Sequence, residues 1–163
     1  MFDFIHPMVV HFPIALIIVA FAAELAGAAL RREFFTKVAL LLLVLGTLGT
    51  VAAYFSGNFA EESVNEVGAV GEALEEHEDA GGAALWAVLA VAAIRSLMAY
   101  KRWMTGWRRW LAVLILAVIS LAISRTGYLG GELVFRHGGG VQTHPGVQSP
   151  DSSTGADEDH NGD

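Results

Sequence analysis

The chain has 163 residues, 54% of them hydrophobic, and a formal net charge of −7. This length and apolar share predict a single membrane-embedded domain. Because the chain contains no cysteine, a disulfide framework, a thiolate metal site and a covalently attached c-type haem are excluded. The sequence also lacks the kind of basic patch that binds nucleic acid, so we expect no nucleic-acid partner.

Four apolar segments are long enough to cross a membrane, namely residues 8–30, 38–56, 81–100 and 107–129. A hydrocarbon core of roughly 30 Å requires about 20 such residues per helix. A spanning segment that stands alone must be helical to satisfy its own backbone hydrogen bonds. The short connections between the first two and the last two segments join antiparallel neighbours, so we predict an all-α fold in which residues 1–137 form a four-helix transmembrane bundle.

The first segment carries two histidines and two prolines near its start. Proline is favoured at the first helical position, so Pro7 predicts that the helix begins near His6. Pro13 cannot donate a hydrogen bond to the carbonyl of Val9, and we expect the helix to be weakened or bent beside His11. An ionisable ring inside a span favours a functional role for His11. His6 lies about 140° away around the helix, which makes it hard for both rings to hold one ion.

The first three segments also contain packing and charge signals. Gly46 and Gly49 lie three residues apart in the second segment, a spacing that lets helix backbones approach closely. Glu24 in the first segment and Arg95 in the third lie at similar depths. We expect them to form an ion pair between these helices, because pairing offsets part of the cost of burying each charge.

The connection between the second and third segments is rich in glutamate. Apolar residues recur at roughly helical spacing between positions 61 and 79, which predicts a helical stretch running into the third segment. His77 lies there among carboxylates. It is either part of a solvated helix start or a ligand whose second nitrogen a carboxylate holds, and the sequence leaves both interpretations open.

The fourth segment ends at a glycine pair, Gly130 and Gly131, followed by further apolar residues. We expect the span to break there and a short re-entrant or capping segment to bring His137 near the other histidines. Arg125, close to the same level, is expected to bind a carboxylate such as Glu132 or a haem propionate. Residues 138–163 are rich in Gly, Ser, Asp and Pro and are predicted to form a disordered acidic tail.

Orientation follows from the basic residues of the two short connections, which the positive-inside rule places in the cytoplasm: Arg31, Arg32, Lys37, Lys101, Arg102, Arg108 and Arg109. Both termini and the glutamate-rich connection are then extracytoplasmic, in a multi-pass protein of the cell (inner) membrane. All six histidines lie at or beyond helix ends on that outer side: His6, His11, His77, His137, His144 and His160.

Three motifs together resemble a known family: the histidine- and proline-containing stretch 6–13, the step 74–78 before the third segment, and the glycine-pair stretch 126–138. Over roughly residues 1–141 the chain is similar to bacterial and archaeal membrane proteins grouped as domain-of-unknown-function family 2231. The resemblance implies a four-span fold and carries no established activity.

The leading functional prediction is a b-type haem near the outer face, serving electron transfer. Non-covalent haem in a helix bundle needs one or two imidazoles, an apolar slot and cationic partners for its propionates. The expected axial ligands are His11 with His77 or His137, and the expected propionate partners are Arg125 and Arg136. His6 is a candidate ligand of a second haem.

Two alternatives remain open. The same outer histidines, His6, His11, His77 and His137, are ligand types that suit copper or zinc. The second alternative is that the protein binds neither haem nor metal and is a non-catalytic structural membrane subunit. The expected partners are the lipid bilayer, a redox partner protein on the outer side, and further copies or subunits in an oligomer or larger membrane complex. The sequence contains no nucleophile–base constellation that indicates an enzyme.

Overall fold

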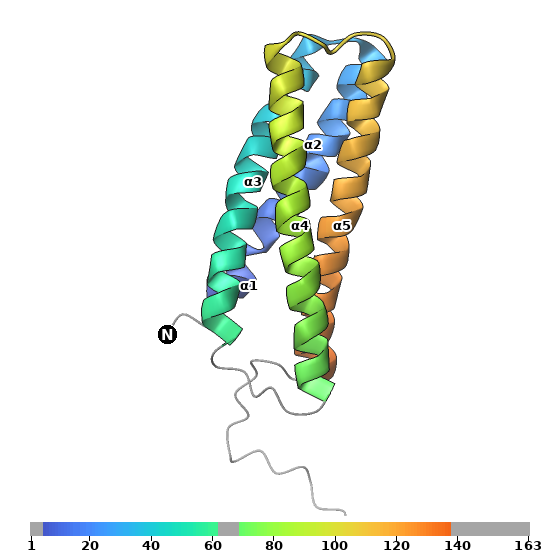
Figure 1. The fold of residues 1–163 in the computed structure, drawn as a ribbon. Helices are drawn as coiled ribbons and strands as arrows, with labels where there is room; N and C mark the ends of the chain where they lie inside the picture. The colour runs from blue at the N-terminus through green and yellow to red at the C-terminus, as the bar shows by residue number, and fades with distance from the viewer. Residues whose placement is uncertain (1–4, 62–68, 138–163) are drawn as a thin grey trace, which may run out of the picture.

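The computed structural model describes residues 5–61 and 69–137, and it is helical almost throughout these ranges (Figure 1). The helices are α1 (Ile5–Val9), α2 (His11–Leu30), α3 (Glu33–Glu61), α4 (Ala69–Tyr100) and α5 (Trp107–His137). Among the described residues, four helical stretches are long and apolar enough to cross a membrane: His6–Leu30, Glu33–Asn58, Val70–Tyr100 and Trp107–Arg136. The all-α fold with four candidate spans is therefore confirmed.

The bundle has two chemically different ends. The short α2–α3 and α4–α5 connections lie together at one end, at the top of Figure 1. We call this the basic end, defined by residues 31–37 and 101–109. The start of α1 and the end of α5 lie at the opposite end, which we call the histidine end after His6 and His77.

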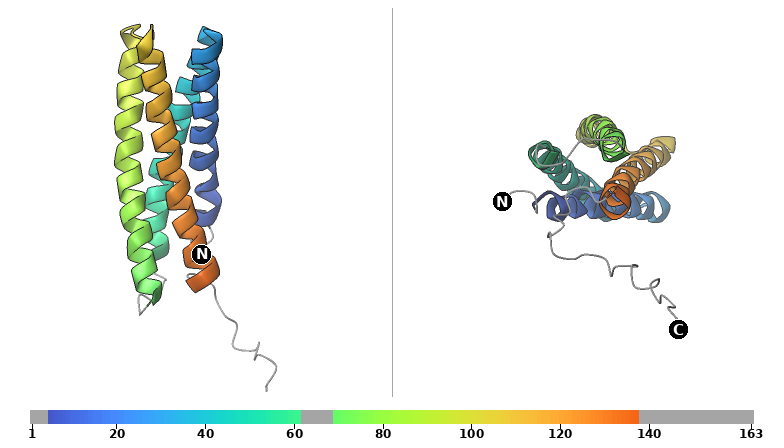
Figure 2. Two further views of the ribbon diagram at one scale, coloured as in Figure 1. Left: turned by 90° about the vertical axis from the view of Figure 1, so that its right-hand side faces the viewer. Right: turned by 90° about the horizontal axis from the view of Figure 1, so that it is seen from below.

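The four long helices occupy the corners of a four-sided bundle (Figure 2). α2 packs against α3 and α5, α4 packs against the same two helices, and α2 and α4 make no close backbone approach to each other within the described ranges. Each corner contributes one buried side chain to a central layer of Ala20, Leu43, Ala92 and Leu116. Side chains therefore fill the space between α2 and α4, the two helices at opposite corners, and the backbones of these helices do not approach each other closely.

The outer surface of the bundle is apolar. Leu41, Trp86 and Leu121 are 58%, 72% and 73% exposed and come from three different helices. Large apolar side chains exposed on several helices of a bundle with four candidate spans are consistent with contact with lipid. In a membrane, these exposed apolar side chains would contact lipid acyl chains.

The predicted weakness at the start of the first segment is a separation into two helices. α1 ends at Val9 and α2 begins at His11, with Val10 between them in a turn. Pro13 lies in the first turn of α2, where a missing N–H costs no intrahelical hydrogen bond. Val10 keeps helical backbone angles (φ −61°, ψ −27°), and His6–Leu30 remains one candidate span, so the weakness is a local irregularity of the first segment.

Two expectations about helix ends are corrected. The helical stretch expected between positions 61 and 79 is present from Ala69 and runs into the third segment, so His77 lies inside α4 and not just before a helix. The chain was expected to fold back after Gly130 and Gly131, but α5 continues through both to His137. An unbroken helix keeps every backbone group hydrogen-bonded, which outweighs a cost of about 1 kcal/mol for an interior glycine. The predicted disordered tail, 138–163, lies outside the described residues.

Candidate functional site

The site at the histidine end begins with His6, which α1 carries against α3. Its Nδ1 lies 3.1 Å from the carbonyl oxygen of Ala53 and 3.0 Å from the hydroxyl oxygen of Ser56. A carbonyl only accepts, so Nδ1 carries the proton when it donates to Ala53, and the lone pair of the ring is then on Nε2. Ser56 was not predicted as part of the site, and its only signal was its position at the end of the second apolar segment.

His77 enters the same region from α4. A Cβ at Gly130 of α5 would lie 2.9 Å from His77 Cε1, so the ring fits because this position carries no side chain. His77 Nδ1 is buried and makes no well-formed hydrogen bond among the described residues, although the backbone of Thr126 lies close enough to the ring to interact with it. A buried ring nitrogen without a partner is costly, which makes this atom the chemically unsatisfied point of the site.

The two rings are neighbours across the bundle. Their centroids lie 6.4 Å apart and their planes meet edge to face at 77°. His6 and His77 thus come together from α1 and α4, although the sequence placed His6 apart as a candidate for a second site.

His11 lies elsewhere. Its side chain is exposed on the outside of α2, and its Nδ1 lies 2.6 Å from the carbonyl oxygen of Pro7, one turn back. The angular separation of His6 and His11 expected from helix geometry is therefore realised, with one ring inside the bundle and one outside. His137 is the last residue of α5, and its side chain lies outside the described part of the structure. Ligand roles for both residues stay predictions.

The two arginines expected near the site form ion pairs on its rim. Arg125 pairs with Glu76 of α4 at 3.1 Å, so it binds a carboxylate as expected, but the partner is Glu76 and not the suggested Glu132. Glu132 instead pairs with Arg136, four residues away on its own helix, where side chains of a helix naturally meet. Both arginines are more than half exposed, so their guanidinium groups remain accessible.

Within the described ranges, no group of three or more His, Cys, Asp or Glu side chains is arranged to hold a metal ion. The site consists of the two imidazoles, the Ser56 hydroxyl and one glycine, Gly130, against which His77 packs. The site as described offers two candidate ligand side chains, the imidazoles of His6 and His77, and this small number limits the kinds of metal centre that it could hold.

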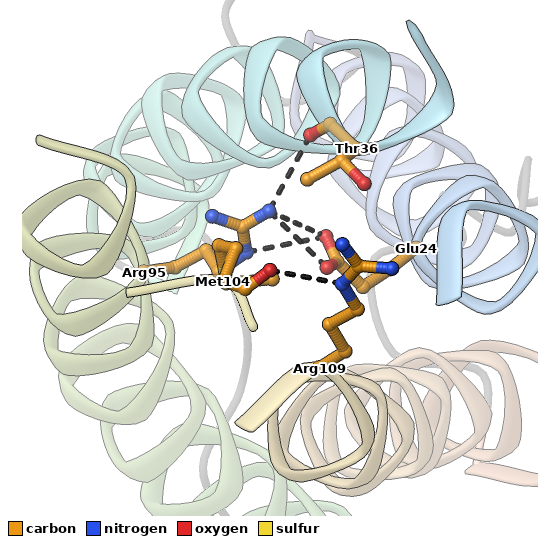
Figure 3. A network of polar contacts seen from close by, with 5 residues as sticks. All are labelled: Glu24, Thr36, Arg95, Met104 and Arg109. Atoms are coloured by element: carbon orange, nitrogen blue, oxygen red, sulfur yellow. Dashed lines mark hydrogen bonds and ion pairs between the residues drawn. The ribbon is translucent and has the colours of Figure 1, made fainter. Parts of the chain in front are cut away.

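A second buried polar cluster lies toward the basic end and was predicted from the sequence. Arg95 donates to Glu24 through Nε at 3.2 Å and through Nη2 at 3.1 and 2.9 Å, and both side chains are almost fully buried (Figure 3). Arg95 Nη2 also lies 3.4 Å from the carbonyl oxygen of Thr36. Because α2 and α4 occupy opposite corners, this pair spans the diagonal of the bundle. We assign it a structural role.

Four long apolar helices, an apolar exterior and charged groups paired inside the bundle define an integral membrane protein. The chain belongs to the family described as "Predicted membrane protein (DUF2231)", whose model matches residues 3–143. The family resemblance drawn from the sequence motifs is thus confirmed. No curated protein and no solved structure matches the chain.

Proposed function

We propose that this membrane protein binds a b-type haem at the histidine end and carries electrons, and that the imidazoles of His6 and His77 would hold the haem. The observation that carries the proposal is the meeting of two imidazoles from separate helices, one of which has a buried nitrogen without a well-formed hydrogen bond among the described residues. Imidazole is the usual protein ligand of haem iron in helical bundles.

The hydrogen bonding of His6 supports a ligand role. Histidines that bind metals commonly donate the N–H of one ring nitrogen to a carbonyl or carboxylate, which fixes the ring and leaves the other nitrogen free. The bond from His6 Nδ1 to Ala53 has this form and leaves Nε2 available.

The number of donors favours haem over the zinc alternative. Zinc takes three or four protein ligands, and no group of three candidate ligands is present in the ranges 5–61 and 69–137. Haem iron needs only one or two axial side chains, because the macrocycle supplies the other four nitrogens.

Ligation requires a ring to turn, since the two imidazoles now meet edge to face. Val10 joins the five-residue α1 to α2 with helical backbone angles (φ −61°, ψ −27°), so the His6 ring would turn about its own side-chain bonds. Arg125 and Arg136 are accessible on the rim, where propionates would compete with Glu76 and Glu132 for their guanidinium groups. Bound haem would supply one-electron redox chemistry, and these residues would hold and orient it.

The test is haem binding by the purified protein, measured by titration and by reduced-minus-oxidised spectra. His77→Ala and His6→Ala are each expected to weaken haem binding by at least about 100-fold, since losing even a residue that only supports a ligand costs about 10–100-fold. His11→Ala is the matched control, because this exposed ring is expected to leave binding unchanged.

Three results contradict the haem assignment. Equal losses in all three variants would mean that His6 and His77 have no special role. Stoichiometric copper or zinc without haem absorption would favour the metal alternative, and neither group bound would leave a structural membrane subunit. A redox partner protein on the same side is expected only if haem is bound.

We further propose that the basic end faces the cytoplasm and that the histidine end and both termini are extracytoplasmic. The support is the concentration of Lys and Arg in the two short connections. An alkaline phosphatase domain fused after residue 163 is expected to be active, because this enzyme matures only outside the cytoplasm. The same domain inserted in the α4–α5 connection is expected to be inactive, and the reverse pattern would overturn the orientation.

A further inference from the structure

We propose that a groove at the basic end binds the headgroup of one anionic phospholipid. The groove has a volume of about 500 Å³ and lies between the end of α2 and the start of α5. Its lining combines two arginines, two tryptophans and two small residues: Ala28, Arg31, Gly106, Trp107, Arg109 and Trp110. This site lies at the opposite end of the bundle from the proposed haem site and does not depend on it.

The charge around the groove opposes the charge of the whole chain. Residues 31–37 and 101–109 contain seven Lys and Arg and one acidic residue, Glu33, which gives a local charge of 7 − 1 = +6 in a chain of net charge −7. Glu33 is already paired with Lys37. The basic end therefore attracts anions, and basic pockets between transmembrane helices are known to bind anionic headgroups.

The two arginines that line the groove have donors to spare. Arg109 donates from Nε to the carbonyl oxygen of Met104 at 2.9 Å, which anchors its guanidinium group while both terminal amino groups stay free of partners within the described ranges (Figure 3). Arg31, at the C-cap of α2, has no side-chain hydrogen bond or ion pair there either. A phosphodiester offers the paired oxygens that guanidinium groups bind best.

The tryptophans favour a lipid over a soluble anion. Trp107 and Trp110 are 69% and 54% exposed beside the arginines. Indole rings on a membrane protein lie at the level of the headgroups. The free guanidinium donors are thus placed at the depth of lipid phosphates, with apolar surface beneath them for the acyl chains.

The test is native mass spectrometry of the full chain from micelles that contain phosphatidylglycerol and phosphatidylcholine. The wild type is expected to retain one phosphatidylglycerol per chain. Arg31→Gln/Arg109→Gln is expected to retain it at least about tenfold less well, because a loss of this size corresponds to one charge-assisted hydrogen bond and the variant removes two arginines.

The matched control is Arg102→Gln/Arg108→Gln, which removes the same charge from the same end but spares the groove lining. Arg102 shares the left-handed backbone of Arg31, with φ values of 56° and 52°, so the backbone cost of substitution is matched. Retention by this control is expected to stay within about threefold of the wild type, since only diffuse attraction is lost. Equal losses in both double variants would show diffuse attraction only and overturn the site.

Two further measurements keep the proposal decisive if the groove variant fails to fold. In wild-type protein, brominated phosphatidylglycerol is expected to quench tryptophan fluorescence more strongly than brominated phosphatidylcholine, and equal quenching would overturn the site. Displacement of the retained lipid by millimolar inorganic phosphate would identify a site for free anions and also overturn it.

Discussion

Replacing Glu24 with leucine is expected to lower the free energy of unfolding by about 3–5 kcal/mol. The substitution leaves the guanidinium group of Arg95 charged, 2% exposed and without the carboxylate that accepts its three hydrogen bonds. The neighbouring carbonyl of Thr36, at 3.4 Å, is a poor replacement. Arg95→Met is expected to cost a similar amount, because it strands the buried carboxylate of Glu24.

The double variant Glu24→Leu/Arg95→Met distinguishes the stabilisation that comes from the ion pair from the cost of burying its two charges. Replacing a buried ion pair with apolar side chains of similar volume is often neutral or stabilising, so the double variant is expected to be more stable than either single variant. Unfolding followed by circular dichroism at increasing dodecyl sulfate measures all three. Glu33→Gln is the control at an exposed pair and is expected to change little. Additive losses would show that the two charges do not interact.

The pair also shows what the sequence could and could not predict. Helix depth can be counted from the basic connections, so the partnership of Glu24 and Arg95 was predictable from position alone. That the pair crosses the diagonal was not, because the corner each helix occupies depends on packing among all four helices. The four spans were also predictable, because the length of each apolar segment indicates a span without any knowledge of how the helices pack.

The histidine end was less predictable because its arrangement depends on helix continuity. The sequence favoured His11 as a ligand on the assumption that a ring within a span points inward. In the structure the five-residue offset between the two histidines places His6 against α3 and leaves His11 outside. The sequence likewise suggested that Gly130 ends a span, whereas the structure uses it as the place where the His77 ring packs against α5. Glycine alone does not distinguish a break from a close contact.

The second large expected effect concerns the close approach of α2 and α3, which the spacing of Gly46 and Gly49 predicted. Gly46→Ala is expected to destabilise the bundle by about 1–3 kcal/mol, the usual cost of inserting a methylene-sized group into a packed core. The new Cβ would lie 2.8 Å from Ile17 Cγ1 and 3.4 Å from Leu16 Cβ. Ile17 is fully buried and has no free space to turn into, and a Cβ moves only with its backbone. The substitution therefore has to push α2 and α3 apart.

Gly82→Ala is the matched control, because a Cβ at this position of α4 meets nothing within 4 Å. Both substitutions gain the same helix propensity, up to about 1 kcal/mol, so the difference between their unfolding free energies isolates the contact between helices. Adding Ile17→Ala to Gly46→Ala is expected to cost less than the sum of the two single variants. The smaller side chain at position 17 removes the clash with the new methyl group, and this methyl group fills part of the cavity that Ile17→Ala leaves. If the two alanine variants were equally stable, α2 and α3 would have to lie farther apart than the contacts of Gly46 place them.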